Sequence, residues 1–222
     1  MGFQRKADRI AALKPDIAVI PECGEIAASA FETYGYSSIW VGSNSTKGLA
    51  VFVRHPLHVR LVSRPEQKII AMLDIEGHKR PLKLIAVWAC KVGSEKCDNY
   101  IGQVCKAFRA NPSWFAHANT VVAGDFNSNS AWDWARPTGN HTTVVEILQK
   151  HKIVSAYHKF YRQKHGEETR NTFYFHKDLQ NPFHIDYVYL PSLWARRLKR
   201  VSIGTHARWA ALSDHRPLVV DF

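Results

Sequence analysis

The chain has 222 residues, of which 45% are hydrophobic and 22% are charged, a composition typical of a globular protein and unlike that of a disordered or low-complexity chain. This length suits one domain, residues 1–222, around one hydrophobic core. Thirty Lys and Arg residues against nineteen Asp and Glu residues give a net charge of +11, so nucleic acids and other polyanions are plausible partners, although a basic protein need not have one.

The N-terminal residues predict a helix followed by a buried strand. Apolar residues between Phe3 and Leu13 recur at helical spacing, and Lys14-Pro15 closes the segment. Ile17 to Ile20 is a short, wholly apolar run of β-type composition, which is typical of a strand buried on both faces. Glu22 is expected just past the end of this strand.

Most of the remaining elements are predicted strands, with two further helices. Short β-rich runs parted by Gly, Pro or Asn predict strands near 38–41, 49–53, 58–62, 69–75 and 82–88. A helix is expected at 98–110 and another at 142–150, with a strand at 120–123 between them. Further strands are expected near 153–156, 172–175, 185–190, 201–203 and 218–222. Strands outnumber helices without a regular strand–helix repeat, so the pattern favours two packed sheets with helices outside.

The four cysteines show neither the spacing of a zinc site nor that of a redox pair. They are Cys23, Cys90, Cys97 and Cys105, and we expect free thiols. No secretory signal and no apolar run long enough to cross a bilayer is visible. The sequence therefore predicts a cytoplasmic protein with no membrane partner.

Four segments resemble, in order and spacing, the motifs of the endonuclease/exonuclease/phosphatase family of metal-dependent phosphodiesterases. They are Pro15-Asp16-Ile17-Ala18-Val19-Ile20-Pro21-Glu22, Gly124-Asp125-Phe126-Asn127, His184-Ile185-Asp186-Tyr187-Val188 and Ser213-Asp214-His215-Arg216-Pro217. Each motif alone fits a surface carboxylate, an Asx turn or an ordinary Asp–His pair equally well. Together they span nearly the whole chain, and the resemblance implies an α/β fold, a four-layer α-β-β-α sandwich of two mixed sheets flanked by helices.

The resemblance assigns metal binding to Glu22, with help from Asp214. Cleavage of a phosphodiester requires stabilisation of the negative charge on the phosphoryl oxygens. A Mg²⁺ or Mn²⁺ ion held by one or two carboxylates and water stabilises this charge. The same resemblance implies that Asp125 aligns or deprotonates the attacking water, while Asn127 holds the scissile phosphate without adding negative charge.

The resemblance also implies that His215 contacts the phosphate and that Asp186 accepts the other ring proton of His215. Whether His215 or Asp125 is the general base stays open. Two further substrate contacts are expected at His184 and Trp209, and Trp132 and Trp134 are also placed to shape a substrate groove, with core packing as the alternative for the tryptophans.

The chain departs from the family pattern in two places. Related proteins normally begin with a strand carrying Trp-Asn-x-Asn or similar, whereas Met1-Gly2-Phe3 starts at the helix. We expect that this strand is a missing segment, with a natural variant that lacks it as the alternative. Loss of that strand would leave backbone groups unpaired, so we expect a form with the strand restored to be more active and to melt higher, and we expect an exposed sheet edge that a second copy could cover in a homodimer. Trp88 stands near where many relatives place a histidine or tyrosine that touches the phosphate.

The expected function is that of a Mg²⁺-dependent phosphodiester hydrolase, a nuclease acting on DNA or RNA, whose binding weakens steeply with salt because of the charge of +11. One alternative is a phosphatase or phosphodiesterase acting on a small phosphorylated substrate. Another is a non-catalytic nucleic-acid-binding module in which the site persists without turnover. The sequence leaves open DNA against RNA, exonuclease against endonuclease action, abasic-site specificity and the number of metals.

Overall fold

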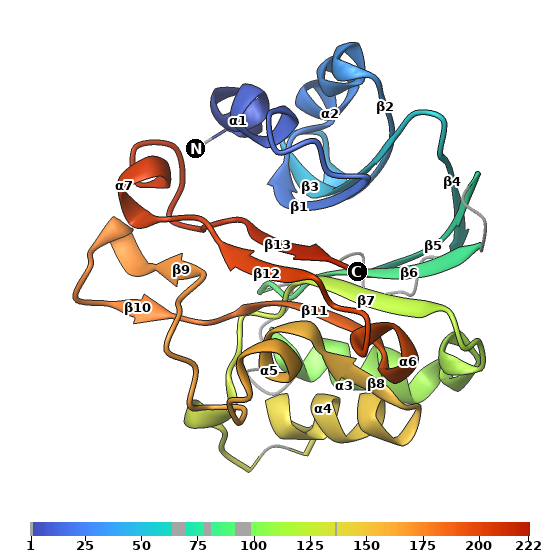
Figure 1. Cartoon of the computed structure of the whole chain (residues 1–222), viewed down its shortest axis with the longest axis vertical. Coiled ribbons are helices and arrows are strands. Elements are labelled where there is room, and N and C mark those ends of the chain that lie inside the picture. The colour runs from blue at the N-terminus through green and yellow to red at the C-terminus, as the bar shows by residue number, and fades with distance from the viewer. Residues whose placement is uncertain (1, 64–69, 78–80, 92–98, 136) are drawn as a thin grey trace.

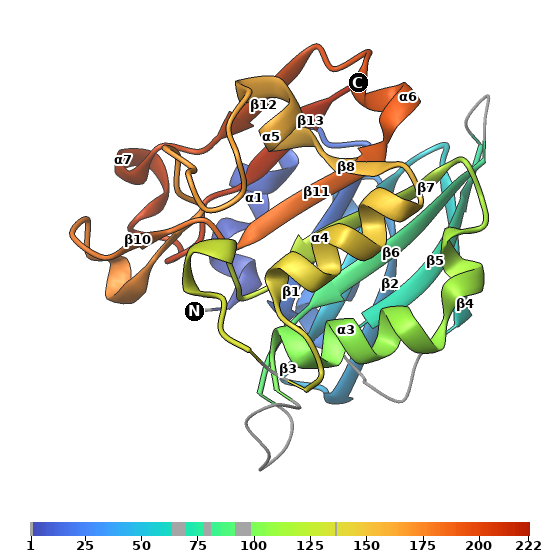
Figure 2. The same cartoon turned by 90° about the horizontal axis from the view of Figure 1, so that it is seen from below.

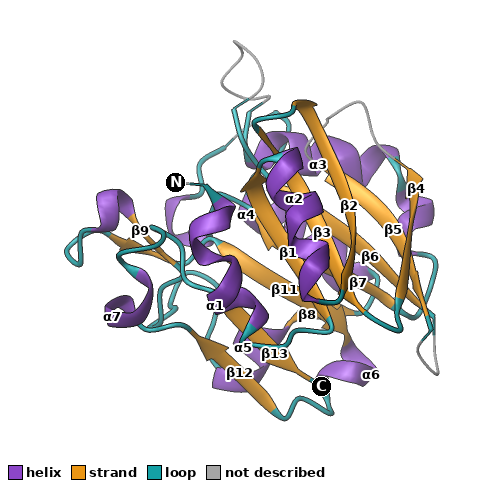
Figure 3. Cartoon of the chain, turned by 90° about the horizontal axis from the view of Figure 1, so that it is seen from above, coloured by secondary structure: helices purple, strands orange, loops and turns teal. Residues whose placement is uncertain are grey.

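The computed structural model describes residues 2–63, 70–77, 81–91, 99–135 and 137–222. They form four layers, in which two small helices, a first sheet, a second sheet and a group of helices follow one another (Figure 1). The helices of one outer layer lie in front of the first sheet in Figure 3, and those of the other lie in front of the second sheet in Figure 2. The expected α-β-β-α sandwich is therefore confirmed.

The first sheet layer contains a three-stranded sheet of order β1–β3–β2 and a separate β12–β13 pair, all antiparallel. These strands are β1 (Ile17–Cys23), β2 (Tyr36–Asn44), β3 (Lys47–Arg54), β12 (Arg200–Ile203) and β13 (Leu218–Asp221). Among the described strands, β1 and β13 each have a hydrogen-bonded neighbour on one side alone. The missing strand and the homodimer through an exposed edge stay predictions.

The second sheet has six strands in the order β4–β5–β6–β7–β11–β8 and is mixed, because β6 and β7 run parallel while the other pairs are antiparallel. Its strands are β4 (His58–Ser63), β5 (Ile70–Glu76), β6 (Leu82–Trp88), β7 (Thr120–Asp125), β8 (Ile153–Ser155) and β11 (Asp186–Pro191). A two-stranded ribbon of β9 (Phe173–Tyr174) and β10 (Pro182–Phe183) stands apart.

The helices are short, and several follow strands directly. They are α1 (Ala7–Ala11), α2 (Glu25–Phe31), α3 (Ile101–Ala110), α4 (His141–Lys150), α5 (Ala156–Tyr161), α6 (Ser192–Ala195) and α7 (His206–Trp209). Short 3₁₀ turns occur at Phe3–Lys6, Glu32–Tyr34, Pro112–Phe115, Ser130–Trp132 and Phe175–Lys177. No helix among the described residues is both long enough and apolar enough to span a bilayer.

The buried apolar residues form two clusters rather than the single expected core, because the first sheet separates them. Alternate residues of β3 enter different clusters: Leu49, Val51 and Val53 face the second sheet, whereas Ala50 and Phe52 face α1 and α2. The larger cluster continues through the second sheet to α3 and α4. In the smaller cluster the Phe52 ring lies between aromatic rings of the N-terminal helices.

Most predicted elements are present within a few residues of their expected bounds, with three differences that matter for function. The N-terminal helix is divided into a 3₁₀ turn and α1. The strand before Glu22 continues to Cys23 instead of ending at Ile20, through an irregularity in its pairing with β3. The expected start of the helix at 98–110 lies outside the described residues, and α3 begins at Ile101. Cys23 and Cys90 are free thiols as expected, the thiol of Cys105 donates to the carbonyl oxygen of Asn140 at 3.4 Å, and Cys97 lies outside the described residues.

Candidate active site

Two carboxylates stand side by side where β7 and β11 meet. Asp125 ends β7, Asp186 begins β11, and the two residues are directly opposite each other in the antiparallel pairing. Directly opposed side chains lie on the same face of a sheet, so both carboxyls enter one small volume. Asp125 is buried, with 3% of its surface exposed. Gly124 permits this arrangement because a Cβ at its φ of +140° would lie 1.9 Å from the carbonyl oxygen of Val87 on β6.

His215 completes this group from the loop before β13. Its Nδ1 lies 2.9 and 3.2 Å from the two carboxylate oxygens of Asp186. The buried Arg216 fixes this loop. Its Nη1 donates to the carbonyl oxygen of Ser213 at 2.6 Å, and its guanidinium stacks on the ring of Tyr174. The imidazole is therefore fixed by its partner and by its backbone.

The charges within this group raise the pKa values of both His215 and Asp125. Burial would lower the pKa of His215, but the charge of Asp186, its hydrogen bond and the charge of Asp125 together raise the pKa to about 9. Burial and the neighbouring charge of Asp186 raise the pKa of Asp125 to about 8. At neutral pH, His215 is therefore an imidazolium that donates to Asp186.

Asn127 turns the chain out of β7 and toward the site. Its backbone is left-handed, with a φ of 46°, and its N–H donates to Oδ1 of Asp125 at 2.8 Å. Phe126, between them, is fully buried and packs edge-on against Tyr187 and Tyr189 of β11. Phe126 therefore points into the core between the two polar residues.

Glu22 and Asp214 lie close enough to this group to influence its charges. The charge of Glu22 contributes to the raised pKa of Asp125, and the charge of Asp214 to that of His215. Glu22 has a left-handed φ of 58° inside β1, and its Oε1 pairs with Lys47 Nζ at 2.7 Å. Hard carboxylate oxygens at a half-open site match Mg²⁺, which keeps several waters and needs few protein ligands.

Lys6, at the end of the 3₁₀ turn before α1, belongs to the same neighbourhood. Its Nζ donates to Ser213 Oγ at 3.4 Å. Burial lowers the pKa of Lys6, while the charges of Asp214, Cys23, Glu22 and Asp186 raise it. No motif marked this residue, because a Lys in an amphipathic helix is ordinarily solvated.

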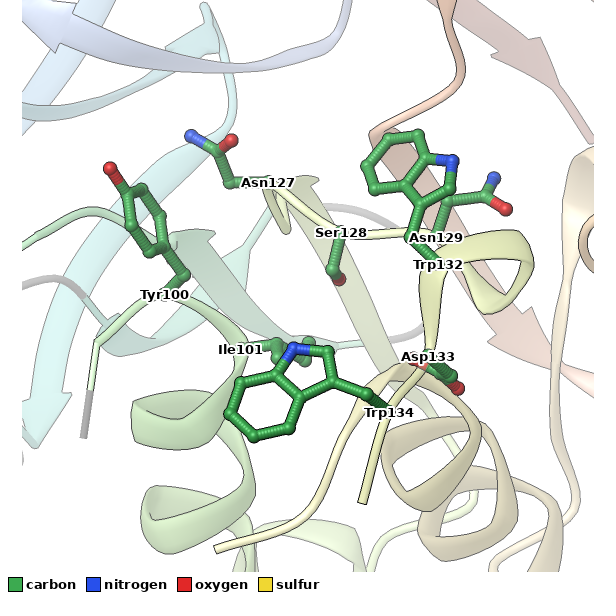
Figure 4. A pocket seen from close by; sticks show the side chains of 8 residues that line it. All are labelled: Tyr100, Ile101, Asn127, Ser128, Asn129, Trp132, Asp133 and Trp134. Carbon is green, nitrogen blue, oxygen red and sulfur yellow. The ribbon is translucent and has the colours of Figure 1, made fainter. Parts of the chain in front are cut away.

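A cavity of about 370 Å³ opens beside Asn127. Its lining combines amides with aromatic rings, namely Tyr100, Ile101, Asn127, Ser128, Asn129, Trp132, Asp133 and Trp134 (Figure 4). Trp132 and Trp134 are 45% and 48% exposed, so both tryptophans shape this opening as expected rather than filling the core. Tyr100 was not singled out from the sequence, which gave it no motif.

The structure keeps two of the expected substrate contacts away from this group. His184 is 2% exposed, and its Nδ1 donates to the carbonyl oxygen of Arg170 at 2.7 Å on the other face of β11. Trp209 is 6% exposed and packs in the smaller apolar cluster, against Gly204. Trp88, in contrast, pairs with Asp125 across β6 and β7 and lies under the ammonium group of Lys47, at the position expected from the family pattern.

Comparison with known proteins assigns the chain to a family. A sequence model of the Endonuclease/Exonuclease/phosphatase family matches residues 7–215. The chain belongs to this family. No curated protein sequence matches it.

Several solved structures share the fold of this family member at low sequence identity. An AP endonuclease from Archaeoglobus fulgidus is 20% identical with a TM-score of 0.68, over 97% of this chain and 92% of that one. The 3′ phosphatase NExo from Neisseria, bound to a product DNA hairpin, is 20% identical with a TM-score of 0.63, over 98% and 94%. TDP2 from D. rerio, complexed with a single-strand DNA product, is 12% identical with a TM-score of 0.64, over 96% and 89%. At these identities the likeness establishes the fold and leaves the substrate open.

Proposed function

We propose that this family member is a Mg²⁺-dependent phosphodiester hydrolase, a nuclease acting on DNA or RNA. The observation that carries the proposal is the Asp125–Asp186–His215 group beside a cavity that contains Asn127 and two exposed tryptophans. The net charge of +11 favours a polyanionic backbone over a small substrate. The Neisseria and D. rerio structures, which hold a product DNA hairpin and a single-strand DNA product, support this choice.

The residues of the site divide the work of hydrolysis. When bound, a divalent cation held by Glu22 and Asp214 would offset the charge of the phosphoryl oxygens. The amide of Asn127 would donate to one of these oxygens, and the imidazolium of His215 would donate to another. Asp186 keeps His215 protonated at neutral pH by raising its pKa to about 9.

Asp125 is the better candidate for the base, because its pKa of about 8 lies below the pKa of about 9 of His215. As pH rises Asp125 loses its proton first, while the imidazolium still has no lone pair to accept one. Asp125 would accept a hydrogen bond from the attacking water and orient it toward phosphorus. The charge of Glu22 contributes to the raised pKa of Asp125. A cation bound at Glu22 would offset that charge and so lower the pKa of Asp125.

Nicking of supercoiled plasmid in Mg²⁺ tests this proposal directly. We expect EDTA to stop nicking, and Glu22→Ala to reduce it at limiting Mg²⁺ by roughly 100-fold, because even outer-shell partners of a metal change its affinity by about 10- to 100-fold. Glu25→Ala is the matched control, since Glu25 is an exposed glutamate three residues away at the start of α2. Nicking should also weaken steeply as salt rises.

The other outcomes of this experiment select the alternatives. Hydrolysis of a small chromogenic phosphodiester without nicking would indicate a phosphodiesterase or phosphatase acting on a small substrate. Plasmid binding without cleavage of either substrate would indicate a non-catalytic nucleic-acid-binding module. Equal nicking by the Glu22→Ala variant and the unchanged protein would contradict the metal-binding role of Glu22.

The exposed tryptophans of the cavity should contribute to substrate binding. We expect Trp132→Ala to raise KM for a single-stranded oligonucleotide by roughly 5- to 150-fold with little change in kcat, because stacking one base on an aromatic ring is worth about 1–3 kcal/mol. Steady-state kinetics on a labelled oligonucleotide measure this effect. Phe160→Ala removes a ring of similar exposure from α5, outside the cavity, and should leave KM unchanged. A fall in kcat alone would argue against stacking.

A further inference from the structure

A second group of ligand-type side chains lies on the helix-covered face of the six-stranded sheet. His158 belongs to α5, and His165 and Glu168 follow in the segment after that helix, which packs beside β8 and β11 (Figure 2). One ligand atom from each of the three residues lies within 4.8 Å of the others. Nothing in the proposed hydrolysis uses these residues.

Glu168 is held in place for such a role by groups outside the three. Its Oε2 accepts from Asn129 Nδ2 at 3.0 Å and from the N–H of Gly166 at 3.1 Å. Its Oε1 lies 2.8 Å from His158 Nε2. The N–H of Gly166 also lies 3.2 Å from Oε1, so both carboxylate oxygens are held by donors and Oε1 in addition faces the imidazole of His158.

His158 has an outer partner that suits either of its tautomers. Its Nδ1 lies 2.7 Å from the hydroxyl oxygen of Ser155, which can donate to a bare ring nitrogen or accept from a protonated one. Without a metal, Nε2 of His158 donates to Glu168 and Nδ1 accepts from the hydroxyl of Ser155. When an ion takes the place of the Nε2 proton, the hydroxyl can accept from a protonated Nδ1, which leaves the Nε2 lone pair for the ion. Metal-bound histidines commonly have such a partner on the second ring nitrogen.

Two nearby imidazole nitrogens are buried and lack any hydrogen-bond partner. Nδ1 of His165 is one of them. Nε2 of His184 is the other, and it is a bare lone pair, because Nδ1 of His184 must be protonated to donate to the carbonyl oxygen of Arg170. A buried polar atom without a partner costs about 1–3 kcal/mol, so each orphan calls for an explanation. A bound cation would satisfy the orphan on His165.

The cluster is open to ions through its own cavity, separate from the one beside Asn127. The cavity has a volume of about 240 Å³, and its lining includes Ser155, His158, His165 and Tyr189. Its residues differ from those of the cavity at Asn127 throughout. An ion with a water in its remaining position would fit here.

His165 and Glu168 carry no competing proton at neutral pH. Burial and the neighbouring His158 lower the pKa of His165 to about 4. Burial would raise the pKa of Glu168, but hydrogen bonds from His158, Asn129 and the backbone lower it to about 2. Metal ligands must be deprotonated to bind, and both groups already are.

We propose that His158, His165 and Glu168 form a binding site for a transition-metal ion of the Zn²⁺ class, distinct from the Mg²⁺ position at Glu22. Two imidazoles and one carboxylate with an open fourth position is a zinc-type set, whereas Mg²⁺ prefers oxygen ligands. Bonds of about 2.0–2.1 Å require ligand atoms roughly 3.3 Å apart in a tetrahedron. Binding therefore replaces the proton between His158 and Glu168, and it turns the His165 ring out of its present stack on His158, where the ring centroids are 3.6 Å apart.

The site would tie α5 to the loop that carries the catalytic amide. Glu168 bonds to Asn129, and Asn129 lies two residues after Asn127 in the lining of the larger cavity. An ion on Glu168 would therefore stiffen one wall of that cavity and raise the melting temperature.

Calorimetric titration with ZnCl₂ alone tests the proposal on the full chain, prepared without a histidine tag and stripped of metal by EDTA and dialysis. The Glu22→Ala background removes the contribution of the proposed Mg²⁺ position. We expect one Zn²⁺ to bind per chain and the melting temperature to rise. Co²⁺ should give the visible absorption of a four-coordinate ion.

Two variants probe the ligands, and a third is the control. His165→Ala and Glu168→Gln should each weaken Zn²⁺ binding at least about 10-fold and remove the Co²⁺ absorption. His165→Ala loses no hydrogen bond made by the buried Nδ1 but does lose the ring contact with His158, so its metal-free melting temperature is measured as well, to separate lost packing from lost metal binding. His117→Ala removes an exposed histidine and should bind Zn²⁺ normally. Absence of Zn²⁺ binding, or equal binding by both ligand variants and the control, would overturn the proposal.

Discussion

Replacing Asp186 with asparagine should lower kcat for phosphodiester cleavage by about 10²- to 10⁴-fold, the range of a general acid or base contribution. Asparagine keeps the shape of the side chain but removes the charge that holds His215 as an imidazolium. The pKa of His215 should fall from about 9 toward its ordinary 6.5. At pH 8 the variant would therefore have lost the charged donor to the phosphate.

The pH dependence gives this prediction a sign. The charge of Asp186 also raises the pKa of Asp125, so removing it lowers that pKa from its value of about 8. The acid limb of kcat/KM, set by protonation of Asp125, and the alkaline limb, set by loss of the His215 proton, should both move to lower pH. Measurements of kcat/KM between about pH 5 and pH 10 should show the same bell-shaped profile with its maximum at lower pH.

Asp16→Asn is the control for the loss of one negative charge. Asp16 is an exposed partner of Arg54 at the start of β1, with 68% of its side chain accessible. Exposed ion pairs contribute little to stability, and the position lies outside the site, so kcat and both limbs should be unchanged. An Asp186→Asn enzyme with an undisplaced pH profile would contradict the assignment of the two limbs.

Elements whose residues obey one clear periodicity could be predicted from the sequence. The alternating or wholly apolar runs that became β3, β5 and β6 are present nearly as expected, since burial of their faces determines both pattern and structure. The helix α2 (Glu25–Phe31) and the helix α5 (Ala156–Tyr161) were not predicted. Helices of about two turns contain too few residues for a periodicity to stand out, and tertiary packing stabilises them.

The motifs located the catalytic group better than they located its surroundings. Asp125, Asn127 and Asp186 could be placed because a strand end brings a short motif to a defined edge. The direction of His184 could not, because His184 precedes β11, and the alternation that would place it on the same face as Asp186 holds only within a regular strand. Lys6 carried no signal at all, since its burial arises from packing of the first helix near the loop at Ser213, 207 residues away.

Buried histidines should lower the free energy of unfolding in acid, and His141, which lies beside His165, should contribute most clearly. It is fully buried at the start of α4, with Nδ1 2.9 Å from Ser128 Oγ and Nε2 3.3 Å from the hydroxyl of Tyr189. Burial and the neighbouring His165 lower the pKa of His141 from 6.5 to about 3. The folded protein thus keeps this ring neutral at a pH where the unfolded chain protonates it.

The sign follows from counting protons. Below pH 6.5 the unfolded state binds one more proton at His141 than the folded state, so the free energy of unfolding falls as pH falls, until the folded state also binds it near pH 3. Each pH unit in this window costs about 1.4 kcal/mol, or roughly 3 kcal/mol between pH 6.5 and pH 4. Asp125 acts in the opposite sense, because its raised pKa of about 8 lets the folded state hold a proton that the unfolded state has lost.

Comparison with His141→Gln isolates the histidine from these opposing groups. Glutamine stays neutral at every pH and can keep one hydrogen bond, so the variant should be less stable than the unchanged protein at pH 7.5 by about 1–3 kcal/mol, the cost of an unsatisfied buried partner. Below pH 6.5 the difference should shrink by about 1.4 kcal/mol per pH unit. Urea denaturation in EDTA at a series of pH values measures it, with His117→Gln, at an exposed position, as the control. Parallel curves for His141→Gln and the unchanged protein would mean that His141 does not titrate differently in the folded and unfolded states, and would remove this account of the acid sensitivity.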